Sequence, residues 1–402
     1  MSASLRVPTS PAAPPPADSP GAATALLEAY RPGTDRFLAT PRHTLLASGT
    51  TALVPHGARP LAQRVREVLD AARRAGGPAP VVVGSVPFSP GGAAVLAVPE
   101  TVRRAASLRA DPLIALRGPG VEQGDDWRIR EIPAAAEYSA AVAAAVRRMR
   151  AGEFDKVVLA RTLELTSARD LDLTGMLGRL ARRDPDGYTF AVPSGPGRTL
   201  VGASPELLVA RRGGRLVANP LAGSAPRSSD LAEDVRRAAA LLDSPKDLHE
   251  HAVVVDAIRE ALAPFCARLD VPERPTLVRT AAMWHLSTTL SGELRDPSST
   301  ALDLASALHP TPAVCGTPTD VARQVIADSE PFDRGAYTGM VGWQDADGDG
   351  DWVVTIRCAE AEGRTLRLFA GAGVVAQSSP AAETAETEAK FQTFLSAVGA
   401  SL

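Results

Sequence analysis

The chain has 402 residues, of which 45% are hydrophobic and 22% charged, and its formal net charge is −3. This near balance of charge gives no reason to expect nucleic acid or a membrane surface as a partner. The three cysteines are far apart in sequence and form no CxxC pair, so a reducing cytoplasm is the expected compartment. No uncharged apolar run approaches the roughly 20 residues that a transmembrane helix needs.

The first part of the chain gives weak signals and the middle gives strong ones. Residues 1–20 are rich in proline, alanine and serine and lack the apolar core of a signal peptide, so we expect a disordered tail there. Residues 21–130 mix short apolar runs with Arg/Ala-rich helical stretches. We expect a helix over residues 135–152 and then a strand from Lys156 to Leu165. Further strands are expected in YTFAV, TLVGASPELLVARR and GRLVANPLAG, with a hairpin at RRGGR.

The last 170 or so residues alternate helices with closely spaced strands. A long helical region is predicted over residues 230–262, with a break at Ser244-Pro245. Beyond residue 330 the pattern gives strand, turn, strand, turn, strand and helix, with Arg357 near the end of the strand WVVTIRCA. Connections this short force antiparallel pairing, because a parallel crossover needs about a dozen residues or more. The predicted fold class is therefore α+β, with large antiparallel sheets and helices in one domain over residues 21–402.

Three motifs imitate familiar sites and are set aside. GAGVVA (Gly371 to Ala376) fits the dinucleotide fingerprint, but only residues 377–402 follow, too few for the next strand and its ribose-binding acid. DADGDGD begins like a calcium loop but has Ile356 at its twelfth position, so a charged hairpin turn is expected there instead. Neighbouring residues on a helix lie about 100° apart, so His249 and His251 in HEH do not share a face, and zinc is not expected there.

Two acidic pairs are candidates for binding a metal. Asp247 with Glu250, and Glu383 with Glu386, have the i,i+3 spacing that puts both carboxylates on one face of a helix. Two such helices facing each other would offer hard oxygen ligands that suit Mg²⁺. The alternative is ordinary surface charge, because acids are favoured in the first turn of a helix and Glu386 could pair with Lys390.

Three other polar residues stand beside apolar runs. Lys156 opens an apolar strand, and Glu206 lies in SPELLV between a proline and a leucine run. Burial raises the pKa of a carboxyl group toward neutrality, which suits acid–base catalysis. Taken singly, Lys156 and Glu206 are more often solvated strand ends, and His285 in AAMWHL is more often a hydrogen-bonded core histidine.

Read together, nine collinear motifs change this weighing. They resemble the chorismate-utilising enzymes, the family of isochorismate synthases, salicylate synthases, and the large subunits of anthranilate and aminodeoxychorismate synthase. The resemblance runs from about Lys156 to Lys390 and is weak before about residue 130. It implies a single α+β domain with two large packed antiparallel sheets, as in anthranilate synthase component I. The motifs are KVVLART, VGASPELLV, NPLAGSAPR, SPKDLHEH, MWHLSTTL, LHPTPAVCGTP, PFDRGAYTGMVGW, VVTIRCAE and LFAGAGVVAQSSPAAETAETEAK.

The resemblance also implies a role for each candidate residue. Lys156 matches the general base for attack of water on C2 of chorismate, and Glu206 matches the acid that protonates the departing C4 hydroxyl. The matched Mg²⁺ ligands are Glu250 and Glu386, with Asp247 and Glu383 as acidic partners that bind the metal directly or through water. The matched substrate contacts are Arg357, Tyr337, Gly371, Ala372 and Gly373 at the enolpyruvyl carboxylate, and Gly223, Ser224 and His285 at the ring.

The choice among family members depends on single positions. The lysine at Lys156 disfavours anthranilate synthase, and Ala222 in PLAG disfavours aminodeoxychorismate synthase, which has a nucleophilic lysine there. Salicylate synthases also expel pyruvate, and they typically have a polar residue where this chain has Ala313. The resemblance therefore implies a Mg²⁺-dependent isochorismate synthase, an isomerase of the siderophore (2,3-dihydroxybenzoate) type. It implies chorismate as substrate and no glutamine amidotransferase subunit.

Two alternatives remain open at this point. The chain could be a salicylate synthase, or a catalytically idle relative that binds chorismate. The product could feed catechol siderophores, menaquinone or salicylate.

Overall fold

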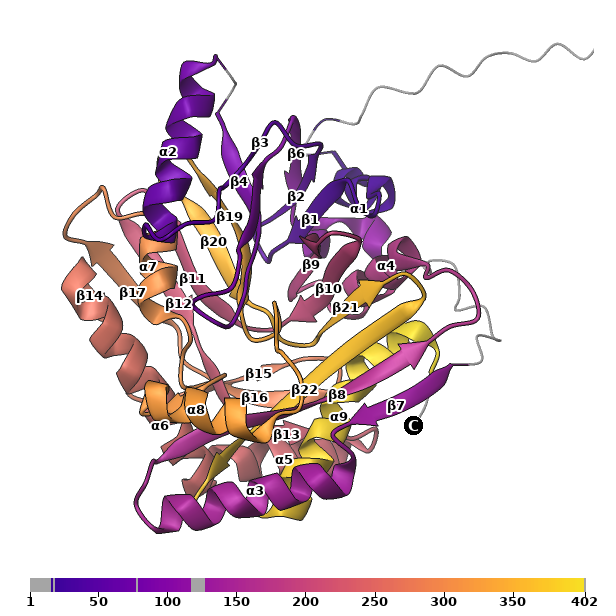
Figure 1. The fold of residues 1–402 in the computed structure, drawn as a ribbon, viewed down its shortest axis with the longest axis vertical. Helices are drawn as coiled ribbons and strands as arrows, with labels where there is room; N and C mark the ends of the chain where they lie inside the picture. Colours follow the sequence, from indigo (N-terminus) through magenta and orange to yellow (C-terminus); the bar gives the residue numbers. More distant parts are fainter. Residues whose placement is uncertain (1–15, 17–18, 77–78, 117–126, 401–402) are drawn as a thin grey trace, which may run out of the picture.

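Two large antiparallel sheets pack face to face, and helices cover their outer faces (Figure 1). The structure is a computed structural model that describes residues 16, 19–76, 79–116 and 127–400. The tail expected at residues 1–20 lies almost wholly outside the described residues. Within the described part, no helix is both long and apolar enough to cross a membrane.

The first sheet has ten strands among the described residues, and each pairs antiparallel with its neighbours. In spatial order these are β18 (Gly316–Thr317), β8 (Lys156–Thr166), β22 (Thr365–Val375), β21 (Cys358–Glu362), β10 (Arg198–Ser204), β9 (Tyr188–Gly195), β1 (Asp35–Ala39), β2 (His43–Ser48) and β6 (Thr101–Ala106), with β7 (Arg128–Ile132) beside β8.

The second sheet has nine strands in the described part of the chain. In spatial order these are β14 (Cys266–Asp270), β17 (Leu290–Leu294), β12 (Arg215–Asn219), β11 (Leu207–Arg212), β20 (Gly350–Val354), β19 (Met340–Asp345), β4 (Val81–Val86), β5 (Val95–Val98) and β3 (Ala52–Leu53). A small third sheet, which the sequence did not predict, contains β13 (Leu221–Pro226), β16 (Met283–Ser287) and β15 (Thr276–Arg279).

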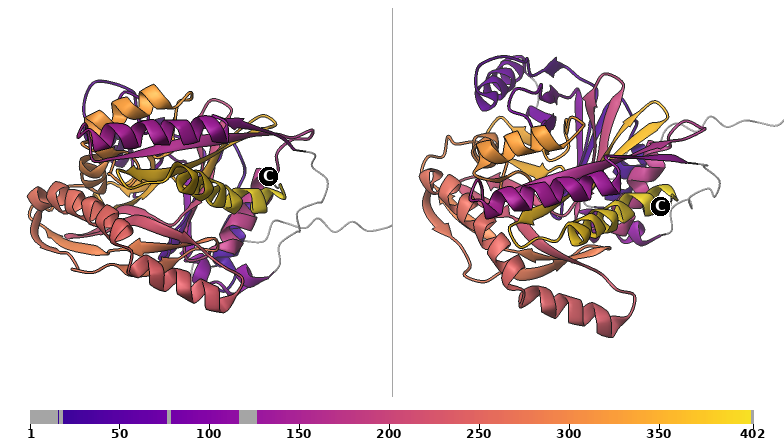
Figure 2. Two further views of the ribbon diagram at one scale, coloured as in Figure 1. Left: turned by 90° about the horizontal axis from the view of Figure 1, so that it is seen from below. Right: turned by 60° about the horizontal axis from the view of Figure 1, so that its bottom comes forward.

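Helices enclose the two sheets. Those that pack on the first sheet include α1 (Ala22–Ala29), α3 (Ala135–Arg150), α4 (Leu173–Arg183), α8 (Thr319–Ser329) and α9 (Pro380–Val398), and α3 and α9 lie side by side (Figure 2). Those on the second sheet are α2 (Leu61–Arg74), α6 (Pro245–Leu262) and α7 (Ala301–Leu308), while α5 (Leu231–Leu242) packs on the small sheet. Among the described residues, three short 3₁₀ helices lie at Leu108–Ala110, Pro112–Ala115 and Ala263–Phe265.

Alternating side chains along the strands build separate cores on the two faces of each sheet. Phe37 of β1 packs under the outer helices, whereas the next residue, Leu38, packs between the sheets. Leu38 belongs to this inner core together with Val341 and Val353 of the second sheet. Successive side chains of a strand point to opposite faces, so a β1 strand that is apolar throughout must be covered on both sides.

Most of the predicted local elements are confirmed. The helix expected over residues 135–152 is α3, and the region 230–262 divides into α5 and α6 at Ser244-Pro245. Ser244 caps α6 because its hydroxyl accepts the N–H of Asp247, and Pro245 occupies the first turn, where no N–H partner is needed. RRGGR joins β11 to β12, and DADGDGD joins β19 to β20, both as hairpins.

Three segments that were expected to be single strands are each divided into two strands that lie in different sheets, so the prediction of one continuous strand is wrong for them. TLVGASPELLVARR leaves the first sheet at Pro205 and Glu206 and continues in the second as β11. GRLVANPLAG divides at Pro220, between β12 and β13. WVVTIRCA divides after Val354, so Arg357 lies between β20 and β21, directly before the start of β21, with φ 49°. Proline lacks the N–H that a sheet ladder requires, which explains two of these breaks.

Gly342 provides a test of the close approach of neighbouring strands in the second sheet. A Cβ at Gly342 would lie 2.1 Å from the backbone oxygen of Asp351 on the neighbouring strand β20. Because backbone atoms cannot move aside cheaply, we expect Gly342→Ala to lower the free energy of unfolding by about 1–3 kcal/mol or more. Thermal or denaturant unfolding measures this change. A Cβ at Gly214 meets nothing within 4 Å, so Gly214→Ala is the matched control, and equal stability of the two variants would contradict the packing described.

Candidate active site

A polar pocket of about 70 Å³ lies where the chain crosses between the sheets. Three of the fifteen residues predicted for the site do not line it. Of these, Lys156 and Glu383 each pair with a residue beside the pocket, and Ala372 is buried in β22. The other twelve do line it: Glu206, Gly223, Ser224, Asp247, Glu250, His285, Ala313, Tyr337, Arg357, Gly371, Gly373 and Glu386.

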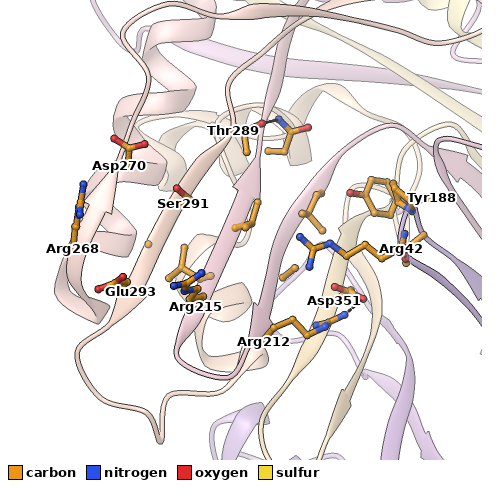
Figure 3. A pocket seen from close by; sticks show the side chains of 18 residues that line it. Arg42, Tyr188, Arg212, Arg215, Arg268, Asp270, Thr289, Ser291, Glu293 and Asp351 are labelled. Atoms are coloured by element: carbon orange, nitrogen blue, oxygen red, sulfur yellow. Dashed lines mark hydrogen bonds and ion pairs between the residues drawn. The ribbon is translucent and has the colours of Figure 1, made fainter. Parts of the chain in front are cut away.

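A larger cleft of about 750 Å³ lies elsewhere, against β11, β12 and β17 (Figure 3). Arg42, Arg212, Arg215 and Arg268 lie along it, together with acidic side chains such as Asp351. None of the fifteen predicted residues lines this cleft. The smaller pocket combines buried titratable groups with an unpaired buried ring nitrogen, so chemistry and not size makes it the candidate active site.

Lys156 and Glu206 are buried, so the interpretation of either as a solvated strand end is wrong. Lys156 is 1% exposed, and its Nζ lies 2.9 Å from Oε1 of Glu250. Glu206 is 2% exposed at the crossing from β10 to β11. Burial raises the pKa of the Glu206 carboxyl group to about 7, although a backbone hydrogen bond from Leu221 and the charge of Lys156 oppose this shift.

Glu206 and Arg357 lie beside each other because two crossings run side by side. β10 pairs with β21 in the first sheet, and β11 pairs with β20 in the second. Between these pairings the N–H of Val354 donates to the carbonyl of Glu206 at 3.1 Å, and the N–H of Ala203 donates to the carbonyl of Arg357 at 3.1 Å. Two polar side chains from distant parts of the sequence therefore meet at one edge of the pocket.

Arg357 offers an unpaired cation to the pocket. Within the described part of the chain, no carboxylate lies within ion-pair distance of its guanidinium, and desolvation by burial lowers its pKa. Tyr337, stacked on Phe369 with ring centroids 4.8 Å apart, lines the pocket with it. A buried guanidinium without a protein partner is suited to a carboxylate of a ligand.

The edge of β22 beyond Leu368 is open to the pocket. β21 pairs with β22 only as far as Leu368, and the carbonyl of Gly371 accepts a hydrogen bond of 2.8 Å from Lys390. N–H and C=O of one residue in a strand point the same way, so the N–H groups of Gly371 and Gly373 face this open edge. Ala372, between them, faces β8 with its backbone groups.

The glycines allow close approach to these backbone groups. A Cβ at Gly373 would lie 2.3 Å from Oε1 of Glu250, and one at Gly371 would lie 2.9 Å from the hydroxyl of Tyr337. Gly223 has φ 80°, a conformation that is strained for residues with a side chain, and a Cβ there would lie 3.1 Å from Cβ of Asp247. Ser224, next to it, donates a hydrogen bond of 3.1 Å to Glu386.

His285 is buried, and its Nε2 has no hydrogen-bond partner among the described residues. Desolvation, with the charges of Arg357 and Lys390, holds the pKa of His285 well below its usual range, so the ring is neutral. The interpretation of His285 as a hydrogen-bonded core histidine is therefore wrong for Nε2. His251 is the satisfied histidine instead, bonded to Ala222 and Thr288.

The two acidic helices face each other, and their carboxylates are not ordinary surface charge. Glu383 of α9 is 1% exposed and accepts a 3.0 Å ion pair from Lys246 of α6. Burial and the charge of Glu386 raise the pKa of Glu383. Burial also raises the pKa of Asp247, and the charges of Glu250 and Glu386 add to this shift. Like charges are thus crowded together.

A lysine accompanies each of three carboxylates. Lys390 lies 2.5 Å from Glu386, the i,i+4 pair expected from spacing. Burial raises the pKa of Glu386, but the charge and hydrogen bond of Lys390, the hydrogen bond from Ser224 and the charge of Lys246 together lower it. Lys246 pairs with Glu383, and Lys156 with Glu250. Nothing in the sequence analysis identified Lys246, and its place beside Asp247 in the SPKD motif was the available signal.

These residues fit a hard divalent cation by their chemistry. In the arrangement described, no three Asp, Glu, His or Cys side chains of the described residues form a ready metal-binding group. Besides burial, the charge of Glu386 raises the pKa of both Asp247 and Glu383, so added positive charge between α6 and α9 would stabilise these two carboxylates.

Known proteins resemble this chain in sequence and in overall fold. Isochorismate synthase DhbC of Bacillus subtilis (strain 168) is 52% identical over 385 residues, covering 93% of this chain and 96% of that protein. The crystal structure of a putative 2,3-dihydroxybenzoate-specific isochorismate synthase, DhbC from Bacillus anthracis, has a TM-score of 0.87 at 47% identity, covering 94% of this chain and 100% of that one.

The fold itself extends to more distant relatives. Anthranilate synthase component I from Streptococcus pneumoniae TIGR4 has a TM-score of 0.72 at 20% identity, covering 89% of this chain and 92% of that one, which shows a shared α+β fold. The family described as chorismate binding enzyme matches residues 118–399. This family match covers more than half of the chain, and the relative from Bacillus subtilis matches 93% of it, so the chain belongs to the chorismate-binding enzyme family.

Proposed function

We propose that this chain is an isochorismate synthase, an isomerase that converts chorismate to isochorismate. Water adds at C2 of the ring and the hydroxyl group leaves from C4. The observation that carries this proposal is the burial of Lys156 and Glu206 beside one pocket, with the pKa of Glu206 raised to about 7. Relatives with this name that are 52% and 40% identical to the chain support the same reaction.

The enolpyruvyl carboxylate of chorismate would bind to Arg357, Tyr337 and the free N–H groups of Gly371 and Gly373. Arg357 has no carboxylate partner among the described residues, so a substrate carboxylate would neutralise it without displacing a protein group. Charge-assisted hydrogen bonds of this kind fix both position and orientation. Gly223, Ser224, Ala313 and His285 would then surround the ring. Holding the ring in one pose lowers the entropic cost of adding water.

Acid and base roles follow from the charge states. Glu206, with a pKa near 7, is substantially protonated at neutral pH and can donate a proton to the leaving C4 hydroxyl. Lys156 is assigned as the base that takes a proton from the attacking water. For this, the ion pair between Lys156 and Glu250 must break, and the amine of Lys156 would be left without this partner if Glu250 held a cation.

We assign the cation to Mg²⁺, with Glu250 and Glu386 as ligands and with Asp247 and Glu383 beside them. With Glu206 protonated, four carboxylates around the pocket face four cationic groups, so a substrate with two carboxylates brings excess negative charge. Mg²⁺ would offset that charge and hold the ring carboxylate. The four carboxylates are Asp247, Glu250, Glu383 and Glu386, and the four cations are Lys156, Lys246, Arg357 and Lys390.

We further propose that residues 21–402 act as one catalytic domain. Strands from before residue 110 extend both sheets, with β1 paired to β9 in the first and β4 paired to β19 in the second, which supports a single folding unit. The three cysteines are free and buried, in keeping with a reducing compartment such as the cytoplasm. Since the nucleophile is water, the reaction needs no glutamine amidotransferase.

The first test is the product profile. Purified protein with chorismate and Mg²⁺, without ammonium, is expected to give isochorismate as the main product by chromatography, and EDTA is expected to remove this activity. Salicylate with pyruvate would move the protein to the salicylate synthases. Binding of chorismate without turnover would identify an idle relative.

Variants of the acid and the base test the assigned roles. General acid–base catalysis contributes about 10²–10⁴-fold in rate, so Lys156→Met and Glu206→Gln are each expected to lower kcat by that factor. Chorismate binding, measured by calorimetry, should persist, because Arg357 and the glycine N–H groups remain. Glu164→Gln, on the same strand as Lys156 but away from the pocket, is the control. A normal kcat in either active-site variant would remove that residue from the mechanism.

The pH dependence of kcat/KM tests the raised pKa of Glu206. Below about pH 7 the carboxyl group is protonated and can act as the acid, and above it the carboxylate cannot. A lysine base must be deprotonated to act, which also depends on pH, so Glu206 is isolated by the ratio of kcat/KM in the wild type to that in Glu206→Gln. We expect this ratio to fall about tenfold per pH unit on the alkaline side of 7, because the wild type loses its acid there and the variant has none to lose. A ratio that stays constant from pH 7 to 9 would contradict the assignment.

A further inference from the structure

The outer edge of β8 has three different partners in succession. At its start β18 pairs with Lys156 and Val157, and from Thr162 onward β7 pairs with it. Between them no strand lies beside β8 in the described structure, and two side chains take its place. Oε1 of Glu330 accepts the N–H of Ala160 at 2.8 Å, and Nη2 of Arg334 donates to the carbonyl of Val158 at 2.7 Å.

Arg334 is fully engaged in hydrogen bonds. Its guanidinium is bidentate with Glu330, at 2.8 Å from Nε to Oε2 and 2.5 Å from Nη2 to Oε1. Nη1 donates to the carbonyl of Val314 at 2.8 Å and to the hydroxyl of Thr338 at 3.2 Å. With the bond to Val158, the five N–H donors that a guanidinium has are matched by five bonds. The residue is 3% exposed.

The partners of Arg334 belong to three walls of the catalytic pocket. Val158, Val314 and Thr338 all line it, from β8, from the segment after Ala313, and from the turn that carries Tyr337. These segments are about 20 to 180 residues apart in sequence, and Arg334 joins them at one point. Lys156 is two residues from Val158 on the same strand, so a shift of β8 at Val158 also moves Lys156.

We infer that Arg334, oriented by Glu330, is a positioning residue that holds the strand of Lys156 in register with the Ala313 and Tyr337 walls. This inference rests on the proposed isochorismate synthase activity. Arg334 does not line the pocket, so it acts through its three neighbours. Arg357, the glycine N–H groups and the acidic helices make no hydrogen bond with Arg334, so among the substrate contacts only those of the Ala313 and Tyr337 walls depend on it, and binding should suffer less than turnover.

Arg211 provides a matched comparison. It is 4% exposed and bonds the carbonyls of Asp347 and Pro297 and the carboxylate of Asp349. It thus has the same kind of buried setting, with main-chain and carboxylate partners. None of its three partners lines the catalytic pocket. A loss caused only by disturbing a buried arginine would appear equally at Arg211 and Arg334.

The experiment compares Arg334→Lys, Glu330→Gln and Arg211→Lys with the wild type. Lysine keeps the charge but cannot reproduce the planar fork. Because a misplacement of about 1 Å can cost about 100-fold in rate, we expect Arg334→Lys to lower kcat about 10- to 100-fold while KM for chorismate changes less than about threefold. Glu330→Gln keeps an acceptor for Ala160 and should lower kcat by a smaller factor. Arg211→Lys should lower Tm and leave kcat unchanged. Thermal unfolding followed by circular dichroism identifies a temperature at which every variant is folded, and kcat is measured there.

Each outcome decides between explanations. Unchanged kcat in folded Arg334→Lys, or an equal loss of kcat in Arg211→Lys, would overturn the positioning role. If Arg334→Lys does not fold, Glu330→Gln decides, and wild-type kcat in that variant overturns the inference. A wild type that forms no isochorismate overturns the proposed function and the inference with it. If the wild type forms isochorismate, the function stands and the variants alone decide the positioning role.

Discussion

The site depends on the places where the chain leaves one sheet and enters another. β10 continues into β11, and β20 into β21, at two crossings that run side by side in opposite directions. Residues at a crossing are released from one ladder before they join the next, so their side chains project into the gap between the sheets. Glu206 and Arg357 occupy these two positions, and the φ of 49° at Arg357 marks the sharp change of direction.

The consequence of this geometry is that many charges are buried together. Ionised groups in a protein interior are costly unless they are paired, and here lysines from three separate elements accompany three of the carboxylates. The unpaired groups are the informative ones, because Arg357 lacks a carboxylate partner and Nε2 of His285 lacks a hydrogen bond in the described structure. A ligand with carboxylates and hydroxyl groups would satisfy both. The pocket is therefore electrostatically incomplete without substrate.

The N-terminal third of the chain contributes framework to this site. β1, β2 and β6 extend the first sheet and β3, β4 and β5 the second, while every residue that lines the pocket comes from Val158 onward. The weak family resemblance before about residue 130 agrees with this division, since residues that only pack tolerate change better than residues in a catalytic site. The inner core, to which both Leu38 and Val341 belong, connects this framework to β19, the strand that follows Tyr337.

The sequence by itself determined the local elements and a set of candidate residues for the site. Helix caps such as Ser244-Pro245, the hairpin glycines and the i,i+3 acidic pairs depend on neighbours in the chain, so α6, α9 and the turns were confirmed, and twelve predicted residues line one pocket. Only the tertiary structure decided which strands divide between sheets, that a third sheet exists, and that Lys156 and Glu206 are buried. Burial and pairing arise from contacts between distant segments, which local periodicity does not encode. Lys246 and Arg334 escaped notice for the same reason, because their partners are distant in sequence or belong to the main chain.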